Sequence, residues 1–278
     1  MPPSHCSNSE CEFQKMNKQN VGDKKVALIT GAGQGIGFAI AKQLSRDGFA
    51  VALNDIAPSN LAAVVDSVQN EGGIALGIAA DVSSRTACTE MVDQVVREWG
   101  RLDVMVANAG LVQVDPLSAV DDAAFDALFA VNVKGVLWSG QAAAAKMLEL
   151  GIKGKIINAG SAVSHMSHPM MGVYGMTKFA VRSMTQTMAL ELAPHGITVN
   201  AYCPGIVETG MWETIDQRMA ELTGAPEGST TEQILQRIPL GRQQTPQDVA
   251  DFVSFLASEK ANYLTGQCIL TDGGMVMI

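Results

Sequence analysis

Short apolar runs alternate with amphipathic stretches along most of this 278-residue chain. The apolar runs predict strands at Lys25–Thr30, Phe49–Asn54, Ile74–Ala80, Leu102–Ala107, Gly154–Asn158, Ile197–Tyr202 and Gln267–Leu270. Helical periodicity between them predicts helices after Gly37 and at Pro58–Glu71, Ser83–Trp99 (with Ser83 the candidate N-cap), Asp121–Met147, Tyr174–Ala193 and Pro246–Ala257. Such alternation is typical of a parallel sheet covered by helices. We therefore predict one α/β domain, a doubly wound (Rossmann) sheet of about seven parallel strands flanked by helices.

Two segments depart from this rhythm. Residues 1–23 are polar and lack the apolar core of a signal peptide, so we expect a flexible tail before a domain at 24–278. The stretch Ile206–Gln244 is polar and interrupted by glycine and proline. We expect residues 206–240 to form a small helical lid over a substrate, because lids exclude water and complete a site. A helix pair that serves only as an interface is the alternative.

The charge and the cysteines exclude several kinds of partner. The formal net charge is −9 and no basic run is present, which argues against nucleic acid and anionic membranes. No apolar run reaches the roughly 18–20 residues that span a bilayer. The five cysteines are scattered, without a CxxC motif or a histidine spacing suited to zinc. We therefore expect reduced thiols, no metal site and a cytoplasmic protein.

A glycine-rich loop, Gly31–Gly37, joins the first strand to the following helix. Its glycines let the backbone approach a pyrophosphate, and the helix N-terminus offers free N–H groups and the positive end of a dipole. This placement between strand and helix makes the glycine pattern informative. The sequence therefore predicts a dinucleotide site here.

The second strand ends in Asp55, roughly twenty residues beyond the glycine loop, where an acid that binds an adenosine ribose is expected. Its carboxylate would accept hydrogen bonds from the ribose hydroxyls and repel a 2′-phosphate. Neither Gln34 nor Ile56 is a basic residue that favours that phosphate. NAD(H) is therefore favoured over NADP(H). A solvated turn residue, or the N-cap of the Pro58 helix, is the alternative reading of Asp55.

The stretch from Gly160 to Lys178 contains Ser161, Tyr174 and Lys178. On a helix, the tyrosine and the lysine four residues later lie on one face. A lysine beside a phenol favours the phenolate, so we expect Lys178 to lower the pKa of Tyr174. Such a tyrosine exchanges a proton with an alcohol or ketone near neutral pH.

The candidate functional residues share one position, just past the end of a predicted strand. Ligands of doubly wound sheets bind at this carboxyl edge, so the agreement supports a single site. Besides the glycine loop, the group comprises Asp55, Asp81, Val82, Asn108, Ala109, Gly110, Ser161, Pro204 and Gly205.

These motifs together resemble the short-chain dehydrogenases/reductases. The resemblance rests on Thr30–Gly37, Asn108-Ala109-Gly110, Asn132, Ser161, Tyr174–Lys178 and Pro204-Gly205. It covers residues 24–278 and departs only at Ala107, where the family usually has asparagine. The resemblance implies an alcohol dehydrogenase or ketone reductase that transfers hydride between a nicotinamide and a carbonyl carbon.

The resemblance also implies a role for each catalytic residue. Tyr174 would exchange a proton with the substrate, and Ser161 would hydrogen-bond its oxygen. Lys178 would hold the nicotinamide ribose, while Asn132 would place a water that links Lys178 to solvent. A helix-interior amide bonded to the backbone is the alternative for Asn132.

Further cofactor contacts are implied at the strand ends. Asp81 and Val82 would flank the adenine, with plain strand-end packing as the alternative. Val207 and Thr209 would contact the carboxamide side of the nicotinamide, with a loop-capping threonine as the alternative. The full expected set is Gly31, Gln34, Gly35, Ile36, Gly37, Asp55, Asp81, Val82, Asn108, Ala109, Gly110, Tyr174, Lys178, Pro204, Gly205, Val207 and Thr209.

Within the family, Ala201–Met211 and the ending Asp272–Val276 most resemble the acetoin/2,3-butanediol dehydrogenases (diacetyl reductases). This implies a small acetoin-, diacetyl- or butanediol-like substrate. The expected substrate contacts are Ala162, His168, Met211 and Trp212. However, Ala162 and His168 stand where the subgroup tends to carry polar residues, and an apolar Met170-Met171 pair follows. A bulkier cyclic or polyketide-type ketone is therefore the alternative substrate.

The helices at Asp121–Met147 and Tyr174–Ala193 are apolar over more than one core face. The corresponding helices of the family pair across subunits, so a homotetramer, or a homodimer, is implied. Burial within a monomer is the alternative. A non-catalytic dinucleotide-binding regulator is the alternative of another class, and the presence of both Tyr174 and Lys178 opposes it.

Overall fold

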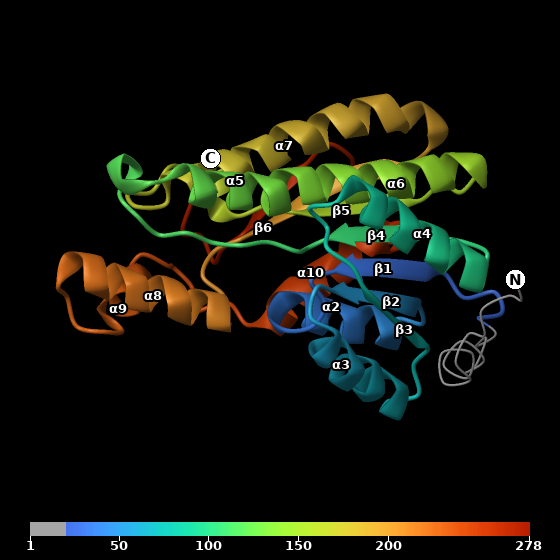
Figure 1. The fold of residues 1–278 in the computed structure, drawn as a ribbon, viewed down its shortest axis with the longest axis horizontal. Coiled ribbons are helices and arrows are strands. Elements are labelled where there is room, and N and C mark those ends of the chain that lie inside the picture. Colours follow the sequence, from blue (N-terminus) through green and yellow to red (C-terminus); the bar gives the residue numbers. More distant parts are fainter. Residues whose placement is uncertain (1–20) are drawn as a thin grey trace, which may run out of the picture.

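A computed structural model describes residues 21–278, so most of the predicted N-terminal tail lies outside the described residues. Seven parallel strands form one sheet in the order β3-β2-β1-β4-β5-β6-β7 (Figure 1). Their bounds are β1 Val26–Thr30, β2 Ala50–Asp55, β3 Ala75–Ala79, β4 Val104–Ala107, β5 Lys155–Ala159, β6 Thr198–Pro204 and β7 Cys268–Thr271. The predicted doubly wound sheet is confirmed, with strand ends within about two residues of those expected.

Helices cover both faces of the sheet, which explains why its strands are apolar runs rather than alternating patterns. One face carries α2 (Gly35–Arg46), α3 (Pro58–Asn70) and α10 (Pro246–Ala257), whose apolar residues form one core cluster with the strands. The other face carries α4 (Arg85–Trp99), α6 (Val136–Glu149) and α7 (Gly172–Leu192), which form a second cluster. The sheet thus separates two hydrophobic cores within a single domain.

Two helix predictions are wrong in detail. Ser84, not Ser83, caps α4, because its hydroxyl accepts a hydrogen bond from the Ala87 amide at 3.3 Å. The Ser83 amide instead donates to Asp81 Oδ1 at 2.9 Å, and this local turn delays the start of the helix. The predicted helix Asp121–Met147 is α5 (Asp122–Phe129) and α6 joined by a π-helical turn at Ala130–Gly135.

The π turn ends in close contact with the chain beyond β3. A side-chain carbon at Gly135 would lie 2.9 Å from Val82 Cγ2, so only glycine lets the helix approach the strand end there. Asn132, within the turn, is fully buried and bonds to the chain beyond β4. Such turns insert an extra residue into a helix and re-aim its side chains, often at functional sites.

Two helices occupy the segment in which a lid was predicted: α8 (Gly210–Thr223) and α9 (Ser229–Leu235). Figure 1 shows them as a pair that extends away from the sheet, following β6 in the chain. Short 3₁₀ helices lie at Leu117–Ala119, Ala162–Ser164, Ala193–His195 and Glu259–Ala261. Across residues 21–278, no helix combines the length and apolar character needed to cross a membrane.

Candidate active site

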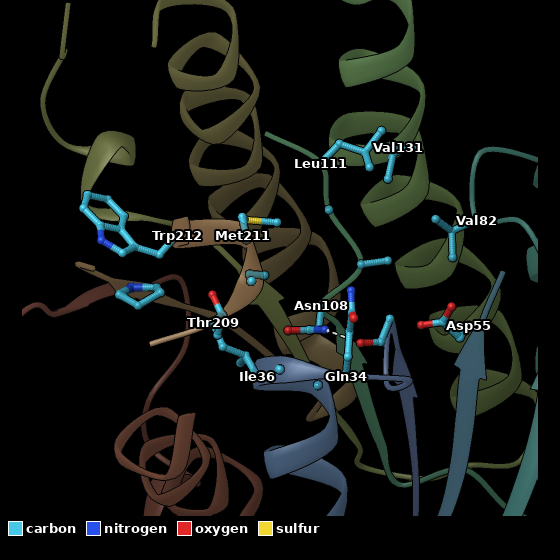
Figure 2. Close-up of a pocket in the computed structure, with 18 of the residues that line it drawn as sticks. Gln34, Ile36, Asp55, Val82, Asn108, Leu111, Val131, Thr209, Met211 and Trp212 are labelled. Carbon is cyan, nitrogen blue, oxygen red and sulfur yellow. Dashed lines mark hydrogen bonds between the residues drawn. The ribbon is translucent and has the colours of Figure 1, made fainter. Parts of the chain in front are cut away.

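A cleft of about 870 Å³ opens at the carboxyl edge of the sheet, where strand order reverses between β1 and β4 (Figure 2). Ligands of doubly wound sheets bind at this switch point. Figure 2 shows Asp55 and Val82 at one end of the cleft and Met211 and Trp212 at the other. Among the expected cofactor contacts, the cleft is lined by Gly31, Gln34, Gly35, Ile36, Gly37, Asp55, Asp81, Val82, Asn108, Ala109, Gly110, Tyr174, Lys178, Pro204 and Thr209.

The glycine loop is shaped as a cradle for a polar ligand. Gly31 has a φ of 62°, which favours glycine, and a side-chain carbon at Gly37 would lie 2.1 Å from the Gly31 carbonyl oxygen. The α2 helix begins at Gly35 without a side-chain cap, so its first N–H groups lack an intrahelical partner, and the residues of this first turn line the cleft. This arrangement fits an anionic group such as a pyrophosphate.

Asp55 links β2 to the glycine loop. Its Oδ2 accepts a hydrogen bond from the Gly33 amide at 3.1 Å, and its Oδ1 accepts one from the Ala57 amide at 3.0 Å. A side-chain carbon at Gly33 would lie 2.6 Å from Oδ2, so the loop needs glycine there. Ala57, not Asp55, is the N-cap of α3. Asp55 therefore combines a turn contact with a place on the cleft wall.

Tyr174 and Lys178 lie on the buried face of α7, with exposed fractions of 9% and 4%. The lysine Nζ is 5.5 Å from the centre of the tyrosine ring and donates a hydrogen bond to the Ala159 carbonyl at 2.9 Å. Helical spacing places both side chains at the cleft, and the carbonyl at the end of β5 orients the ammonium group.

The expected lowering of the tyrosine pKa does not hold in this structure. Burial raises the pKa of Tyr174 to about 12, with a smaller opposing effect from a hydrogen bond to Ser161. Burial also lowers the pKa of Lys178 to about 8. The reason is desolvation, which disfavours the charged form of each group in a dry site. Near neutral pH the phenol is therefore protonated, ready to act as an acid.

Ser161 begins the short 3₁₀ helix after β5, and a reciprocal capping box fixes it. Its Oγ accepts from the Val163 amide at 3.4 Å, while the Ser161 amide donates to Ser164 Oγ at 3.1 Å. The hydroxyl lines a second, smaller cavity of about 260 Å³ rather than the large cleft. Tyr174 lines both cavities and so stands at their junction.

Asn132 lies behind the cleft wall. Its Oδ1 accepts from the Leu111 amide at 2.8 Å, and its Nδ2 donates to the Leu111 carbonyl at 2.9 Å and to Thr177 Oγ1 at 3.1 Å. These contacts match the alternative reading of a buried amide bonded to backbone. They also hold the loop after β4 against α7, because Thr177 is the α7 residue directly before Lys178.

The smaller cavity brings together every residue expected to contact substrate. These are Ala162, His168, Met211 and Trp212, with Gly205, Val207 and Thr209 from the expected cofactor set. Its remaining wall is mostly apolar and includes Met166, Met171, Ile206, Ile215, Met219, Ile234 and Met275. The Met170-Met171 run and the predicted lid at 206–240 gave a signal for part of this wall, whereas Met166 and Met275 come from segments far apart in the chain and had none.

One positioning network is absent from the sequence predictions. The Tyr202 hydroxyl donates to Asn108 Oδ1 at 2.7 Å, and Asn108 Nδ2 donates to the Thr30 and Gly31 carbonyls at 2.9 and 3.1 Å. These hydrogen bonds connect β6, through Asn108 after β4, to the glycine loop. Its partners are separated by up to 94 residues, so no local pattern reveals it.

Fold and site together define a Rossmann-type nucleotide-binding protein, and comparisons with known proteins narrow this class. A family model described as enoyl-(acyl carrier protein) reductase matches residues 31–276. A diacetyl reductase [(S)-acetoin forming] of Staphylococcus epidermidis is 47% identical, over 91% of this chain and 98% of its own. An L-2,3-butanediol dehydrogenase of Corynebacterium glutamicum is 44% identical over the same shares.

Solved structures of dehydrogenases and reductases have the same fold. A sorbitol-6-phosphate 2-dehydrogenase from Erwinia amylovora superposes with a TM-score of 0.87 at 30% identity, covering 91% of this chain and all of its own. A short-chain dehydrogenase/reductase variant from Serratia marcescens gives 0.81 at 34% identity, covering 90% of this chain and 97% of its own. The chain belongs to the short-chain dehydrogenase/reductase family, whose dehydrogenases use nicotinamide cofactors. It is an oxidoreductase of the alcohol and ketone class, as predicted.

Proposed function

We propose that this protein is an NAD(H)-dependent enzyme that interconverts a small vicinal hydroxy-ketone or diol with its ketone, the acetoin, diacetyl and butanediol class. The observation that carries the proposal is the position of Tyr174, a buried proton donor between a dinucleotide-sized cleft and a small apolar cavity. The substrate class is supported by the diacetyl reductase and butanediol dehydrogenase relatives.

The cleft fits a dinucleotide. The glycine cradle and the uncapped start of α2 would hold the pyrophosphate, and Asp55 would accept hydrogen bonds from the adenosine ribose. Lys178 is the one lysine or arginine among the described residues that line the cleft, so no cation there favours a 2′-phosphate near Asp55. When bound, the nicotinamide supplies or accepts the hydride.

The chain's own residues manage the proton and the developing charge. In the reduction direction, Tyr174 donates its hydroxyl proton to the substrate oxygen, and its raised pKa keeps that proton in place near pH 7. The Ser161 hydroxyl stabilises negative charge on the same oxygen. The Lys178 ammonium, held by Ala159, favours the phenolate that remains. Asn132 is proposed to help place the water that reconnects Lys178 to solvent.

A bulkier ketone is the second candidate, and the wall of the smaller cavity favours it. Met166, Met171 and Met219 line that cavity, and methionine side chains adapt readily to different apolar shapes. A panel of ketones separates the two candidates. Diacetyl and acetoin are expected to give higher kcat/KM than bulky cyclic ketones, with NADH followed at 340 nm; the reverse order would favour the second candidate.

The Tyr174→Phe variant tests the catalytic assignment. Loss of the hydroxyl is expected to lower kcat by a factor of about 10² or more, while NADH still binds, because the ring and the cleft remain. NADH affinity is read by fluorescence titration. Full turnover in the variant would refute the role of Tyr174 and favour a non-catalytic dinucleotide-binding regulator.

We also propose a homotetramer located in the cytoplasm. The outer face of α7 exposes Met176, Phe179 and Leu190, and α5 exposes Phe125 beside it. An apolar stripe of this kind is typical of a surface covered by a second copy. The scattered cysteines support a reducing compartment.

A further inference from the structure

A hydrogen-bond chain links α9 to the tryptophan at the start of α8. Trp212 Nε1 donates to Thr231 Oγ1 at 2.9 Å. The Thr231 hydroxyl in turn donates to Asp216 Oδ1 at 2.9 Å. The sequence predictions placed Trp212 near a substrate and placed Thr231 and Asp216 in the lid, without a role of their own.

Asp216 is an unusual anchor because its carboxylate is buried, with a residue exposure of 7%. Its donors are the Gly228 amide at 2.6 Å, the Thr231 amide at 2.8 Å and the Thr231 hydroxyl. A buried carboxylate is tolerated when such hydrogen bonds satisfy it. Asp216 therefore holds the first turn of α9 and the loop before it against α8.

The direction of the chain follows from the chemistry of its members. The indole N–H only donates, and a carboxylate only accepts. The Thr231 hydroxyl has a single proton, which it gives to Asp216, so its oxygen is free to accept from Trp212. Rotation of the indole away from Thr231 would leave its N–H without this partner.

Trp212 lines both the large cleft and the smaller cavity, so its orientation shapes the space between them (Figure 2). The helix that carries it is also fixed to the rest of the domain. Arg218 pairs with Asp115 at 2.7 Å, and Ile215 and Met219 pack on Val114. The indole packs against the same cluster, and its one side-chain hydrogen bond, to Thr231, fixes the direction of its N–H within that contact.

We propose that Thr231 and Asp216 are positioning residues that hold the Trp212 indole as a wall of the substrate cavity and thereby limit the size of the ketone accepted. The limit on substrate size rests on the proposed function, whereas the orientation of Trp212 does not. Thr231 is the point to test because valine has nearly the same shape but no hydroxyl, and serine keeps the hydroxyl.

The kinetic test compares Thr231→Val with Thr231→Ser. The measured quantity is the ratio of kcat/KM for diacetyl to kcat/KM for 1-phenyl-1,2-propanedione, with NADH as reductant. Thr231→Val is expected to lower this ratio about tenfold, mainly through KM, as the loss of one hydrogen bond allows. Thr231→Ser is expected to restore it to within about twofold. An unchanged ratio in Thr231→Val, or the same loss in both variants, would overturn the proposal.

A fluorescence measurement tests the orientation of Trp212 without any turnover. Acrylamide quenching attributable to Trp212 is obtained by comparing each protein with its own Trp212→Phe counterpart. This quenching should increase in Thr231→Val and not in Thr231→Ser. If the wild type reduces neither ketone, the proposed function fails, but the quenching measurement still tests whether Thr231 holds the indole. Equal quenching in the wild type, Thr231→Val and Thr231→Ser would refute the positioning role of Thr231.

A double-mutant comparison keeps the proposal falsifiable should Thr231→Val fold poorly. Asp216→Asn removes the charge that accepts the Thr231 proton but preserves shape. In the Trp212→Phe background, which lacks the indole N–H, either substitution is expected to change the kcat/KM ratio by less than twofold. An equal effect in the presence and absence of the indole would show that Thr231 and Asp216 act on the cavity by another route.

Discussion

At the scale of single residues, the site is governed by desolvation. Tyr174 and Lys178 are both buried, and the energetic consequence differs for each because one is neutral and the other charged near pH 7. A buried neutral phenol is tolerated, whereas a buried ammonium costs free energy of folding. The chain thus carries at Lys178 a destabilising group that the proposed chemistry requires.

Lys178→Met is therefore expected to stabilise the fold while abolishing turnover. Burial lowers the pKa of Lys178 from 10.5 to about 8 in the folded protein. The loss of folding free energy that this causes is fully present below pH 8, where the lysine is charged in both states. The loss is relieved as the pH rises toward about 10.5. The variant should exceed the wild type by about 1–3 kcal/mol in unfolding free energy at pH 7, with the difference shrinking toward pH 10. Urea unfolding at equal protein concentration measures it.

The exposed Lys153→Met serves as the control, since it removes the same charge without relieving burial. Its unfolding free energy should remain within about 0.5 kcal/mol of the wild type across this range. A Lys178→Met protein less stable than the wild type at pH 7 would contradict the account of burial.

Asp55→Asn tests the charge at the proposed ribose site. Asparagine keeps an acceptor for the Gly33 amide but removes the negative charge that repels a 2′-phosphate. The ratio of kcat/KM with NADPH to that with NADH is expected to rise about tenfold, equivalent to about 1.4 kcal/mol. Asp66→Asn, an exposed carboxylate on α3, is the matched control for net charge. A ratio that moves equally in both variants would remove the ribose assignment.

At the scale of elements, the ends of the helices decide the shape of the site. The α2 start is left uncapped and faces the cleft, whereas the α10 start is closed by a capping box. Thr245 Oγ1 accepts from the Asp248 amide at 3.1 Å, and Asp248 Oδ2 accepts from the Thr245 amide at 2.7 Å. Because α10 packs on α2, this cap supports the helix beneath the glycine loop.

Thr245→Ala should lower stability by about 1 kcal/mol, the usual cost of losing an N-cap side chain. For a domain of this size, that corresponds to a fall of about 2–4 °C in Tm, measured by differential scanning calorimetry. Thr89→Ala, exposed on α4, is the control and is expected to change Tm by less than about 1 °C. Equal Tm values for Thr245→Ala and the wild type would show that the cap contributes nothing.

At the scale of the whole molecule, the exposed apolar residues on α7 bear on whether copies of the chain associate. Phe179 is 43% exposed and Met176 is 45% exposed on the outer face of α7, although the helix already fills its inner face with core residues. Exposed side chains of this kind in a row favour burial against a second copy.

Phe179→Asp is accordingly expected to split the proposed tetramer into smaller species, because a buried unpaired charge is costly at an interface. Multi-angle light scattering after size-exclusion chromatography gives the mass directly. Ala62→Asp adds the same charge on the exposed face of α3 and should leave the mass unchanged. A Phe179→Asp protein with the wild-type mass would place the interface elsewhere.

The sequence by itself determined the strand and helix order, the glycine turn and the pairing of Tyr174 with Lys178. Buried parallel strands are continuous apolar runs, and helical spacing depends only on neighbours within a turn, so these features are local. The position of the candidate residues just past the strand ends extended this local prediction to the carboxyl edge of the sheet.

Only the tertiary structure decided the π turn around Asn132, the chain from Trp212 to Asp216, and the direction of the pKa shift of Tyr174. The wall of the smaller cavity belongs to the same group, since Met166, Ile215 and Met275 come from three distant segments. Each depends on which residues the packed chain brings together and on how much water they exclude. Burial is a sum over the whole fold, and no stretch of sequence carries it.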